Sequence, residues 1–237
     1  MSPLLLLTRP LPQSRRFARE AASTLPPHEP LIAPLSQVVA LPFDPAVFAG
    51  ARGIILTSAS AVPMLPPLPG LTAWCVGPAT ARAAARAGMI PRQGGGDAAA
   101  LIATLTGAAP EGPLVHAHGV HLARDLVRDL AGALPGLTLR SVAVYEARAL
   151  DWPPDVVPAL TGQRVFAPLF SPRAAQRLAA QSGIMDVTGL TPVAISAACA
   201  AALPPALAER TLIAGTPDAG GMLRALAEAM SHPGTVG

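Results

Sequence analysis

Small polar residues directly follow five short apolar runs of the sequence. These polar segments are Thr8-Arg9-Pro10, Thr57-Ser58-Ala59, Gly77-Pro78-Ala79-Thr80, His118-Gly119 and Ser171-Pro172-Arg173. If the apolar runs are parallel strands, the segments lie at their carboxyl ends, where helix N-termini present free N–H groups to ligands. One serine or threonine at such a place is more simply explained as a helix N-cap. Five such segments around one cleft predict a surface that binds an anion.

A cluster of three histidines, His116, His118 and His121, has a spacing typical of metal ligands. It resembles the His-x-His-x-Asp-His zinc motif of metallo-β-lactamases, but Val120 stands at the aspartate position. The other histidines, at positions 28 and 232, fall in a predicted loop and near the terminus, so further ligands are missing. We therefore expect no metal, and interpret the histidines as part of a loop over the cleft. A zinc hydrolase is the alternative, and metal bound to the purified protein would support it.

Three other features could take part in chemistry. Gly94-Gly95-Gly96-Asp97 resembles a phosphate loop, but it lacks a lysine and the GxGxxG spacing, so a turn with Asp97 as N-cap is expected. Cys199 could be a nucleophile at a helix N-terminus, or a small buried apolar residue. Tyr145, the only tyrosine, could donate a proton to a leaving hydroxyl if its phenol faces a cleft.

The basic residues are all arginine. The 237 residues include 17 arginines, 14 acidic residues and no lysine. This composition excludes chemistry that needs an ε-amine from this chain, such as a pyridoxal-phosphate Schiff base or a P-loop lysine. The net charge of +3 and the eight aromatic residues also argue against a nucleic-acid partner.

The sequence contains no sign of secretion or membrane insertion. Two cysteines are too few for a disulfide scaffold, and the run Leu4–Leu7 is too short for a signal peptide. No uninterrupted apolar stretch approaches the ~18 residues of a membrane helix. We expect a cytoplasmic protein with no membrane contact.

Apolar runs alternate with alanine-rich segments along most of the chain. Strands are predicted at residues 4–7, 54–56, 73–76, 113–116, 164–170, 193–195 and 212–214. Helices are predicted at residues 13–22, 59–65, 79–87, 121–131, 173–181, 197–203 and 218–230, with Gly88 as a C-cap. Such alternation is typical of βαβ units and parallel sheets.

An internal repeat indicates two similar domains. Ser58 and Ser171 each end a predicted strand and lie 113 residues apart. Gly77 and Ser196 lie 119 residues apart in similar strand-to-helix segments, and Asp97 and Asp218 start similar helices 121 residues apart. Three features that recur in one order favour a pair of α/β domains over one large sheet.

Two segments alternate like strands but lack a following helix. We interpret these segments, residues 34–41 and 137–147, as connecting strands that run in opposite directions. Residues 1–33 with 148–237 then form a discontinuous domain, and residues 42–136 an inserted one. The predicted fold is α/β, with two flavodoxin-like domains, parallel sheets, a two-stranded antiparallel connector and a ligand cleft between the domains.

Six motifs follow one another along the chain: Leu7-Thr8-Arg9-Pro10, Ile55-Leu56-Thr57-Ser58-Ala59-Ser60-Ala61-Val62, Val76-Gly77-Pro78-Ala79-Thr80-Ala81 with Gly88, Val144-Tyr145-Glu146, Phe170-Ser171-Pro172 and Pro217-Asp218-Ala219-Gly220-Gly221-Met222-Leu223. In the order of these motifs, the whole chain resembles the uroporphyrinogen-III synthase family. No single motif is very specific; their order and spacing are.

The resemblance implies a lyase of tetrapyrrole biosynthesis that needs no cofactor or metal. Its substrate would be hydroxymethylbilane, cyclised to uroporphyrinogen III with loss of water and inversion of ring D through a spiro intermediate. Tyr145 would be the general acid. The implied substrate-binding residues are Thr8, Arg9, Thr57, Ser58, Ala59, Gly77, Thr80, His118, Gly119, Ser171, Pro172 and Cys199. A monomer that receives its substrate from hydroxymethylbilane synthase is expected.

The chain departs from the family pattern in two places. His118-Gly119 stands where members commonly have Arg-Gly, and Ser196-Ala197-Ala198-Cys199-Ala200 stands where they commonly have Gly-Pro-Thr-Thr-Ala. The alternative function is therefore a non-catalytic two-domain protein that binds a polycarboxylate tetrapyrrole. With so few basic residues, either function predicts carboxylate recognition by helix-terminal N–H groups and a few arginines.

Overall fold

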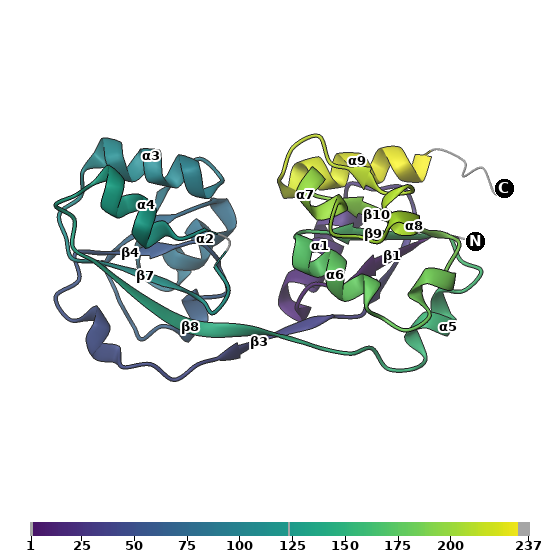
Figure 1. Cartoon of the computed structure of the whole chain (residues 1–237), viewed down its shortest axis with the longest axis horizontal. Coiled ribbons are helices and arrows are strands. Elements are labelled where there is room, and N and C mark those ends of the chain that lie inside the picture. The colour runs from purple at the N-terminus through teal and green to yellow at the C-terminus, as the bar shows by residue number, and fades with distance from the viewer. Residues whose placement is uncertain (1, 123, 232–237) are drawn as a thin grey trace. The chain divides into compact units, whose positions relative to one another are not determined.

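The chain folds into two compact units. A computed structural model describes residues 2–122 and 124–231, so His232 lies outside the described residues. One unit comprises Met1–Gln37 with Ala149–Gly237, and the other comprises Val38–Arg148 (Figure 1). The chain therefore passes between the units twice, and the second unit is an insertion in the first.

The first unit is built on a sheet of five parallel strands in the order β11-β10-β9-β1-β2. These strands are β1 (Leu4–Leu7), β2 (Glu29–Ile32), β9 (Val165–Leu169), β10 (Leu190–Ala194) and β11 (Leu212–Ile213). Because β2 lies on one side of β1 and β9 on the other, the chain reverses its direction of winding between β1 and β9. In doubly wound sheets, ligands bind beside such a point.

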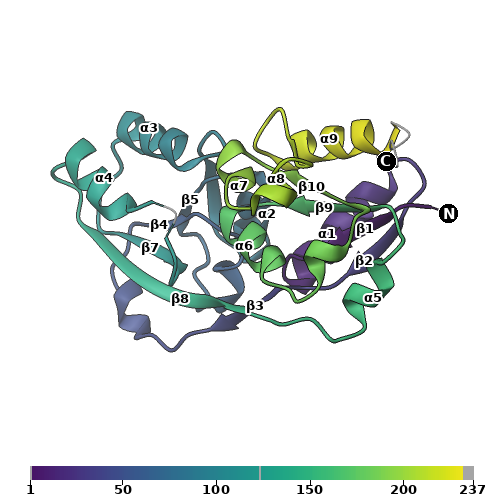
Figure 2. The ribbon, with the colours of Figure 1, turned by 45° about the vertical axis from the view of Figure 1, so that its right-hand side comes forward.

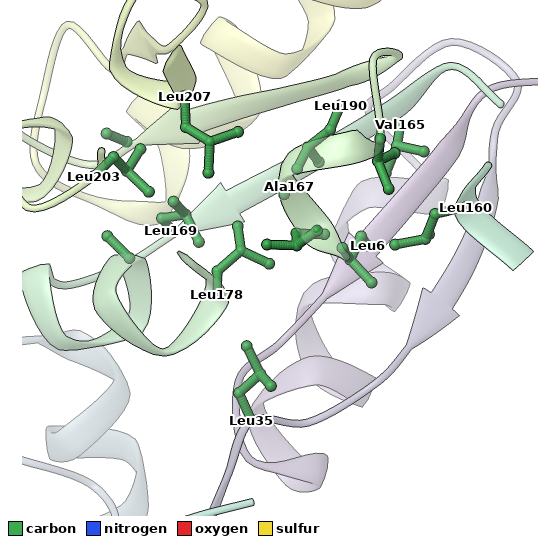
Figure 3. Close-up of a cluster of buried hydrophobic side chains, with 14 of the residues drawn as sticks. Leu6, Leu35, Leu160, Val165, Ala167, Leu169, Leu178, Leu190, Leu203 and Leu207 are labelled. Atoms are coloured by element: carbon green, nitrogen blue, oxygen red, sulfur yellow. The ribbon is translucent and has the colours of Figure 1, made fainter. Parts of the chain in front are cut away.

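Both faces of this sheet are buried under helices. The helices are α1 (Leu11–Ala22), α5 (Val156–Leu160), α6 (Pro172–Ala179), α7 (Ala197–Ala200), α8 (Pro205–Ala208) and α9 (Ala219–Ser231), with a short 3-10 helix, η3 (Ile184–Asp186). Leu6 packs with Leu178 of α6 and Leu207 of α8 on one face (Figure 3), whereas Leu5 and Leu7 pack with α1 and α9 on the other. Alternation of side chains along β1 thus explains its uninterrupted run of leucines.

The second unit is built on a six-stranded sheet in the order β3-β8-β7-β4-β5-β6. The strands are β3 (Ser36–Ala40), β4 (Gly53–Leu56), β5 (Thr72–Cys75), β6 (Ile90–Gln93), β7 (Leu114–Gly119) and β8 (Leu139–Ala149). The five strands from β8 to β6 are parallel to their neighbours. At the edge, Leu41 N–H donates to Val144 C=O and Leu150 N–H to Leu35 C=O, each at 3.0 Å, so the chain around β3 runs antiparallel to β8.

Helices again cover both faces of the second sheet. They are α2 (Pro78–Arg86), α3 (Ala98–Ala108) and α4 (Leu126–Ala133), with two 3-10 helices, η1 (Pro45–Phe48) and η2 (Val62–Met64). Leucines of α3 and α4 pack with Ile55 and Trp74, whereas Ala84 of α2 and Phe48 of η1 pack with Ile54 and Leu56. Figures 1 and 2 both show α3 and α4 on the same face of this sheet.

The two parallel sheets have the same spatial order of corresponding strands. The order β8-β7-β4-β5-β6 matches β2-β1-β9-β10-β11 strand for strand. Ser58 and Ser171, the first pair of the sequence repeat, follow the corresponding strands β4 and β9. The chain enters the second arrangement at β4 rather than at β7, so the units are circular permutations of each other, and the end of β7 corresponds to the end of β1.

One predicted helix is wrong, and another begins later than predicted. The segment at residues 59–65 forms only the 3-10 helix η2. Pro63 has no N–H to donate, and the residue before a proline disfavours the α conformation. The segment predicted as a helix from His121 begins its helix only at Leu126, after the N-cap Asp125, because this aspartate accepts a hydrogen bond from Arg128 N.

Other local predictions are confirmed. Asp97 caps α3 by accepting a hydrogen bond from Ala100 N at 2.8 Å. Gly88 follows α2 with a φ of 81°, the left-handed conformation that favours glycine at this place.

The sequence does not predict the short strands β2 and β6, because Pro30 and Pro91 interrupt their apolar patterns.

None of the helices in the described part of the chain is long and apolar enough to cross a membrane.

Candidate functional site

The predicted site residues lie at the carboxyl edges of the two parallel sheets. Thr8, Arg9, Ser171, Pro172 and Cys199 belong to the first unit. The second unit contributes Thr57, Ser58, Ala59, Gly77, Thr80, His118, Gly119 and Tyr145. Each unit thus forms one edge that is lined by several of the predicted residues.

Arg9 is the cation of the first edge. Its guanidinium lies 4.1 Å from the centroid of the Phe170 ring, which in turn contacts Phe17 edge-on at 5.2 Å. Burial, together with the nearby charge of Arg16, lowers the pKa of Arg9 to about 10, so it stays positive at neutral pH. Among the described residues, Arg9 forms no ion pair. Its charge, held against an aromatic ring beside the point where the winding reverses, is therefore available to an anion.

The hydroxyl groups of the first edge are less accessible than predicted. Thr8 is 3% exposed, and its enclosed Oγ1 has no hydrogen-bond partner within the part of the chain that the structure describes. Ser171 Oγ accepts a hydrogen bond from Ala174 N at 3.1 Å and so caps α6, of which Pro172 is the first residue. Helix capping, the simpler of the two interpretations, therefore accounts for the side chain of Ser171.

Cys199 is a packing residue. Its side chain is fully buried in the core of the first unit, with Sγ 3.5 Å from the carbonyl oxygen of Leu169. Burial raises the pKa of the thiol, which disfavours a thiolate nucleophile. The N–H of Cys199 is used locally as well, because Ser196 accepts it.

The second edge includes the uncapped N-terminus of α2. Gly77 is the N-cap of this helix and offers no side chain to its first turn, and Thr80 is 6% exposed in that turn. On the neighbouring strand, Ser58 Oγ accepts a hydrogen bond from Ser60 N at 3.2 Å, next to Thr57 and Ala59. The first turn of α2 therefore retains N–H groups that can bind an anion.

Tyr145 and Gly119 are in direct contact. They are paired in the register of β7 and β8, just beyond a β-bulge between His118 and Gly119. A Cβ atom on residue 119 would lie 2.6 Å from Cζ of Tyr145 and 3.0 Å from its hydroxyl oxygen. The phenol therefore lies over the glycine backbone, and the absence of a side chain at position 119 is what makes room for it.

Two histidines of β7, His116 and His118, precede Gly119 on the same strand. His118 is 9% exposed; its Nδ1 is 2.7 Å from the carbonyl oxygen of Gly119 and its Nε2 is 2.8 Å from Ser141 Oγ. His116 is fully buried, and neither of its ring nitrogens has a hydrogen-bond partner among the described residues. The centroid of its ring lies 4.7 Å from that of His118. Burial, followed by the proximity of His118, lowers the pKa of His116 to about 4, so it is neutral at physiological pH.

The interpretation of the three histidines as part of one loop is wrong. His116 and His118 are buried on β7, because the strand continues to Gly119. His121 is exposed in the segment before α4, not one helical turn beyond His118. Within residues 2–122 and 124–231, no group of three or more histidine, cysteine, aspartate or glutamate side chains is arranged to hold a metal ion.

Sequence reasoning missed the contributions of Phe170 and Ser141. Phe170 directly precedes the predicted Ser171, so its position next to Arg9 required only that β1 and β9 be neighbours. Ser141 lies on β8, opposite His116 in the strand register. Its bond to His118 depends on that register, which the local sequence does not contain.

A family model described as uroporphyrinogen-III synthase HemD matches residues 26–224. No curated protein sequence matches the chain. Among solved structures, the uroporphyrinogen-III synthetase of Helicobacter pylori 26695 matches with a TM-score of 0.62 and 15% identity, over 97% of this chain and 100% of that one. A mutant uroporphyrinogen III synthase from the extremely thermophilic bacterium Thermus thermophilus matches with a TM-score of 0.50 and 18% identity, over 96% and 98% of the two chains. At these identities, the two structures establish a shared two-sheet α/β fold.

The contact at Gly119 yields a structural prediction. In Gly119→Ala, the new methyl group displaces the Tyr145 ring while the protein stays folded, because only a side chain blocks the methyl. The resonance of ¹³C-labelled tyrosine, which is unique in this sequence, then shifts while the circular dichroism spectrum is retained. Gly132→Ala on α4 is the control, since nothing lies within 4 Å of its new Cβ. An unchanged tyrosine resonance in Gly119→Ala would contradict the contact.

The buried His116 predicts a pH dependence of stability. Its ordinary pKa of 6.5 falls to about 4 in the folded protein, so the unfolded chain binds a proton more readily. This difference contributes about 3 kcal/mol to the free energy of unfolding above pH 6.5, and the contribution is lost as the pH falls toward 4. Urea unfolding at a series of pH values measures it. His116→Leu loses less stability than the parent protein between pH 7 and 4, whereas the exposed control His121→Leu behaves like the parent. Equal losses in His116→Leu and the parent would show the prediction wrong.

Proposed function

Because the chain belongs to the uroporphyrinogen-III synthase family, we propose that it cyclises hydroxymethylbilane to uroporphyrinogen III, with loss of water and inversion of ring D. The observation that supports this most directly is the placement of the only tyrosine, a proton donor, over Gly119 at the carboxyl edge of a parallel sheet. By this proposal the protein is a lyase of tetrapyrrole biosynthesis.

Tyr145 is the proposed general acid. Its phenol protonates the hydroxyl group of the substrate, and the C–O bond breaks to release water and leave an azafulvene cation. The substituted carbon of ring D attacks this cation to form a spiro-pyrrolenine, which fragments and recloses with the ring inverted. Since closure at the free carbon gives the unrearranged isomer I, the protein must also hold the substrate in the pose that leads to inversion.

The carboxylates of the substrate are bound by few charges. Arg9 supplies a cation that forms no ion pair with an acidic side chain of the described residues. The N-terminus of α2 supplies backbone N–H groups next to Gly77 and Thr80, and Thr57, Ser58 and Ala59 lie on the neighbouring strand end. Backbone donors suit a chain with 17 basic residues, because they bind anions without added charge.

The finer architecture belongs to the same proposal. The strand orders suit two flavodoxin-like domains, with β3 and β8 as an antiparallel connector between residues 1–33 with 148–237 and residues 42–136. We further propose that the protein is a cytoplasmic monomer that receives hydroxymethylbilane from its synthase.

The isomer of the product tests the function. Fresh hydroxymethylbilane is added to the protein, and the porphyrins are oxidised and separated; isomer III is expected, while a sample without protein gives isomer I. Tyr145→Phe, which lacks only the hydroxyl, slows formation of isomer III by about 10²- to 10⁴-fold, the usual contribution of a general acid. Isomer I alone, with tight binding of uroporphyrin, would identify a non-catalytic binding protein instead. A Tyr145→Phe rate equal to that of the parent would remove the acid role.

Loss of the Arg9 charge tests substrate binding. Arg9→Gln raises KM for hydroxymethylbilane by about 10- to 100-fold with a smaller change in kcat, as expected for one charge-assisted hydrogen bond. Arg15→Gln is the matched control, because it removes the same charge from an exposed side chain of α1. If KM increases equally in both variants, the effect of Arg9→Gln comes from the lower net charge of the protein and not from a contact of Arg9 with substrate.

A further inference from the structure

The ring of His118 has a single tautomer that satisfies both of its neighbours. The Gly119 carbonyl oxygen, 2.7 Å from Nδ1, can only accept a hydrogen bond. Nδ1 must therefore carry a proton, and in the neutral ring Nε2 is an acceptor. The hydroxyl group of Ser141, with Oγ 2.8 Å from Nε2, then donates a hydrogen bond to the histidine. Both nitrogens are thus engaged within the protein.

These bonds fix a backbone position that would otherwise be loosely held. The β-bulge interrupts the pairing of β7 with β8 between His118 and Gly119, so the ladder does not hold Gly119 in regular register. The bond from His118 immobilises the Gly119 carbonyl, and Val120 N–H donates to Tyr145 C=O at 2.9 Å on the far side of the bulge. On the other side of the imidazole, the ring of His116 restricts its movement.

The position of Gly119 in turn determines where the phenol can lie. The Tyr145 ring occupies the space where a side chain of residue 119 would lie. A shift of the Gly119 peptide by a fraction of an ångström therefore changes the position of the ring. Proton transfer depends steeply on the position of the donor. A side chain that never touches substrate can therefore control the reaction through Gly119.

We propose that His118, oriented by Ser141, is a positioning residue that holds the Gly119 peptide at the β-bulge and thereby sets the location of the Tyr145 phenol. The catalytic consequence rests on the proposed function, in which Tyr145 is the acid; the structural consequence does not. The role differs from the predicted substrate contact of His118, because the side chain is only 9% exposed and neither ring nitrogen is free.

Two substitutions distinguish the two hydrogen bonds of the His118 side chain. His118→Asn places an amide nitrogen near the position of Nδ1 and keeps the donor to Gly119, whereas His118→Gln reaches the position of Nε2 and keeps only the contact to Ser141. We expect His118→Asn to retain the tyrosine resonance and most of kcat. His118→Gln shifts the resonance and lowers kcat by up to about 100-fold, the cost of a misplacement near 1 Å, with KM little changed.

Ser141 provides a second, milder pair of variants. Ser141→Ala removes the donor to Nε2, shifts the tyrosine resonance and lowers kcat by a smaller factor, and Ser141→Thr, which keeps the hydroxyl, restores both. If His118→Gln does not fold, as judged by circular dichroism, the comparison of Ser141→Ala with Ser141→Thr decides. The control is His28, whose Nδ1 lies 2.8 Å from the carbonyl oxygen of Pro26, so His28→Asn and His28→Gln make the same chemical changes elsewhere and leave all readouts unchanged.

The resonance of the only tyrosine separates failure of this proposal from failure of the proposed function. If the parent protein makes no isomer III but the resonance moves in His118→Gln and Ser141→Ala, the function fails and the positioning role stands. If the resonance stays in place in the folded variants, positioning is overturned. An increase in KM in both His118→Asn and His118→Gln, with the resonance unmoved, would assign His118 to direct substrate binding instead.

Discussion

The contact between Tyr145 and the backbone of Gly119 is the constraint on which the carboxyl edge of the second unit's sheet depends. The phenol occupies space that any side chain at position 119 would fill. This arrangement requires the parallel pairing of β7 with β8, a bulge in that pairing and a peptide held in place beyond the bulge. Buried His118 and exposed Ser141 form the hydrogen bonds that hold it. The core of this unit is otherwise almost entirely apolar. Burial of two imidazole rings in such surroundings costs free energy, which the hydrogen bonds of His118 partly offset.

In the described part of the chain, at least seven of the 17 arginines form hydrogen bonds to backbone carbonyl groups or ion pairs within the protein. Arg140, Arg164 and Arg210 donate to backbone carbonyl groups and so stabilise the fold. Four others lie in ion pairs with acidic side chains: Arg16, Arg52, Arg124 and Arg148. Arg9 belongs to neither set: its guanidinium lies against the Phe170 ring, and it forms no ion pair with an acidic side chain of the described residues. In the proposed function, Arg9 and helix N-termini bind the carboxylates of the substrate, and the low charge of the chain is compatible with this chemistry.

Corresponding strand ends of the two permuted sheets carry different side chains. The end of β1 leads into Thr8-Arg9, and the end of β7 leads into His118-Gly119. The first keeps a cation for an anionic ligand, whereas the second places a small residue beneath an aromatic proton donor. In the proposed function, the strand end of the first sheet binds substrate and that of the second supplies the acid, so one repeated fold carries two different sites.

The sequence by itself determined the fold class, the family and most element positions, because alternation of apolar strands with alanine-rich helices, and the spacing of Ser58 and Ser171, are local or periodic signals. It also indicated which strand ends carry polar residues. Only the tertiary structure decided the surroundings of these side chains: Thr8 and Cys199 are enclosed, Ser171 caps a helix, and His121 lies before the helix predicted to contain it. The pairing of His118 with Ser141 depends on strand register and on a bulge. Burial and register arise from contacts between residues far apart in the chain, and no local pattern encodes them.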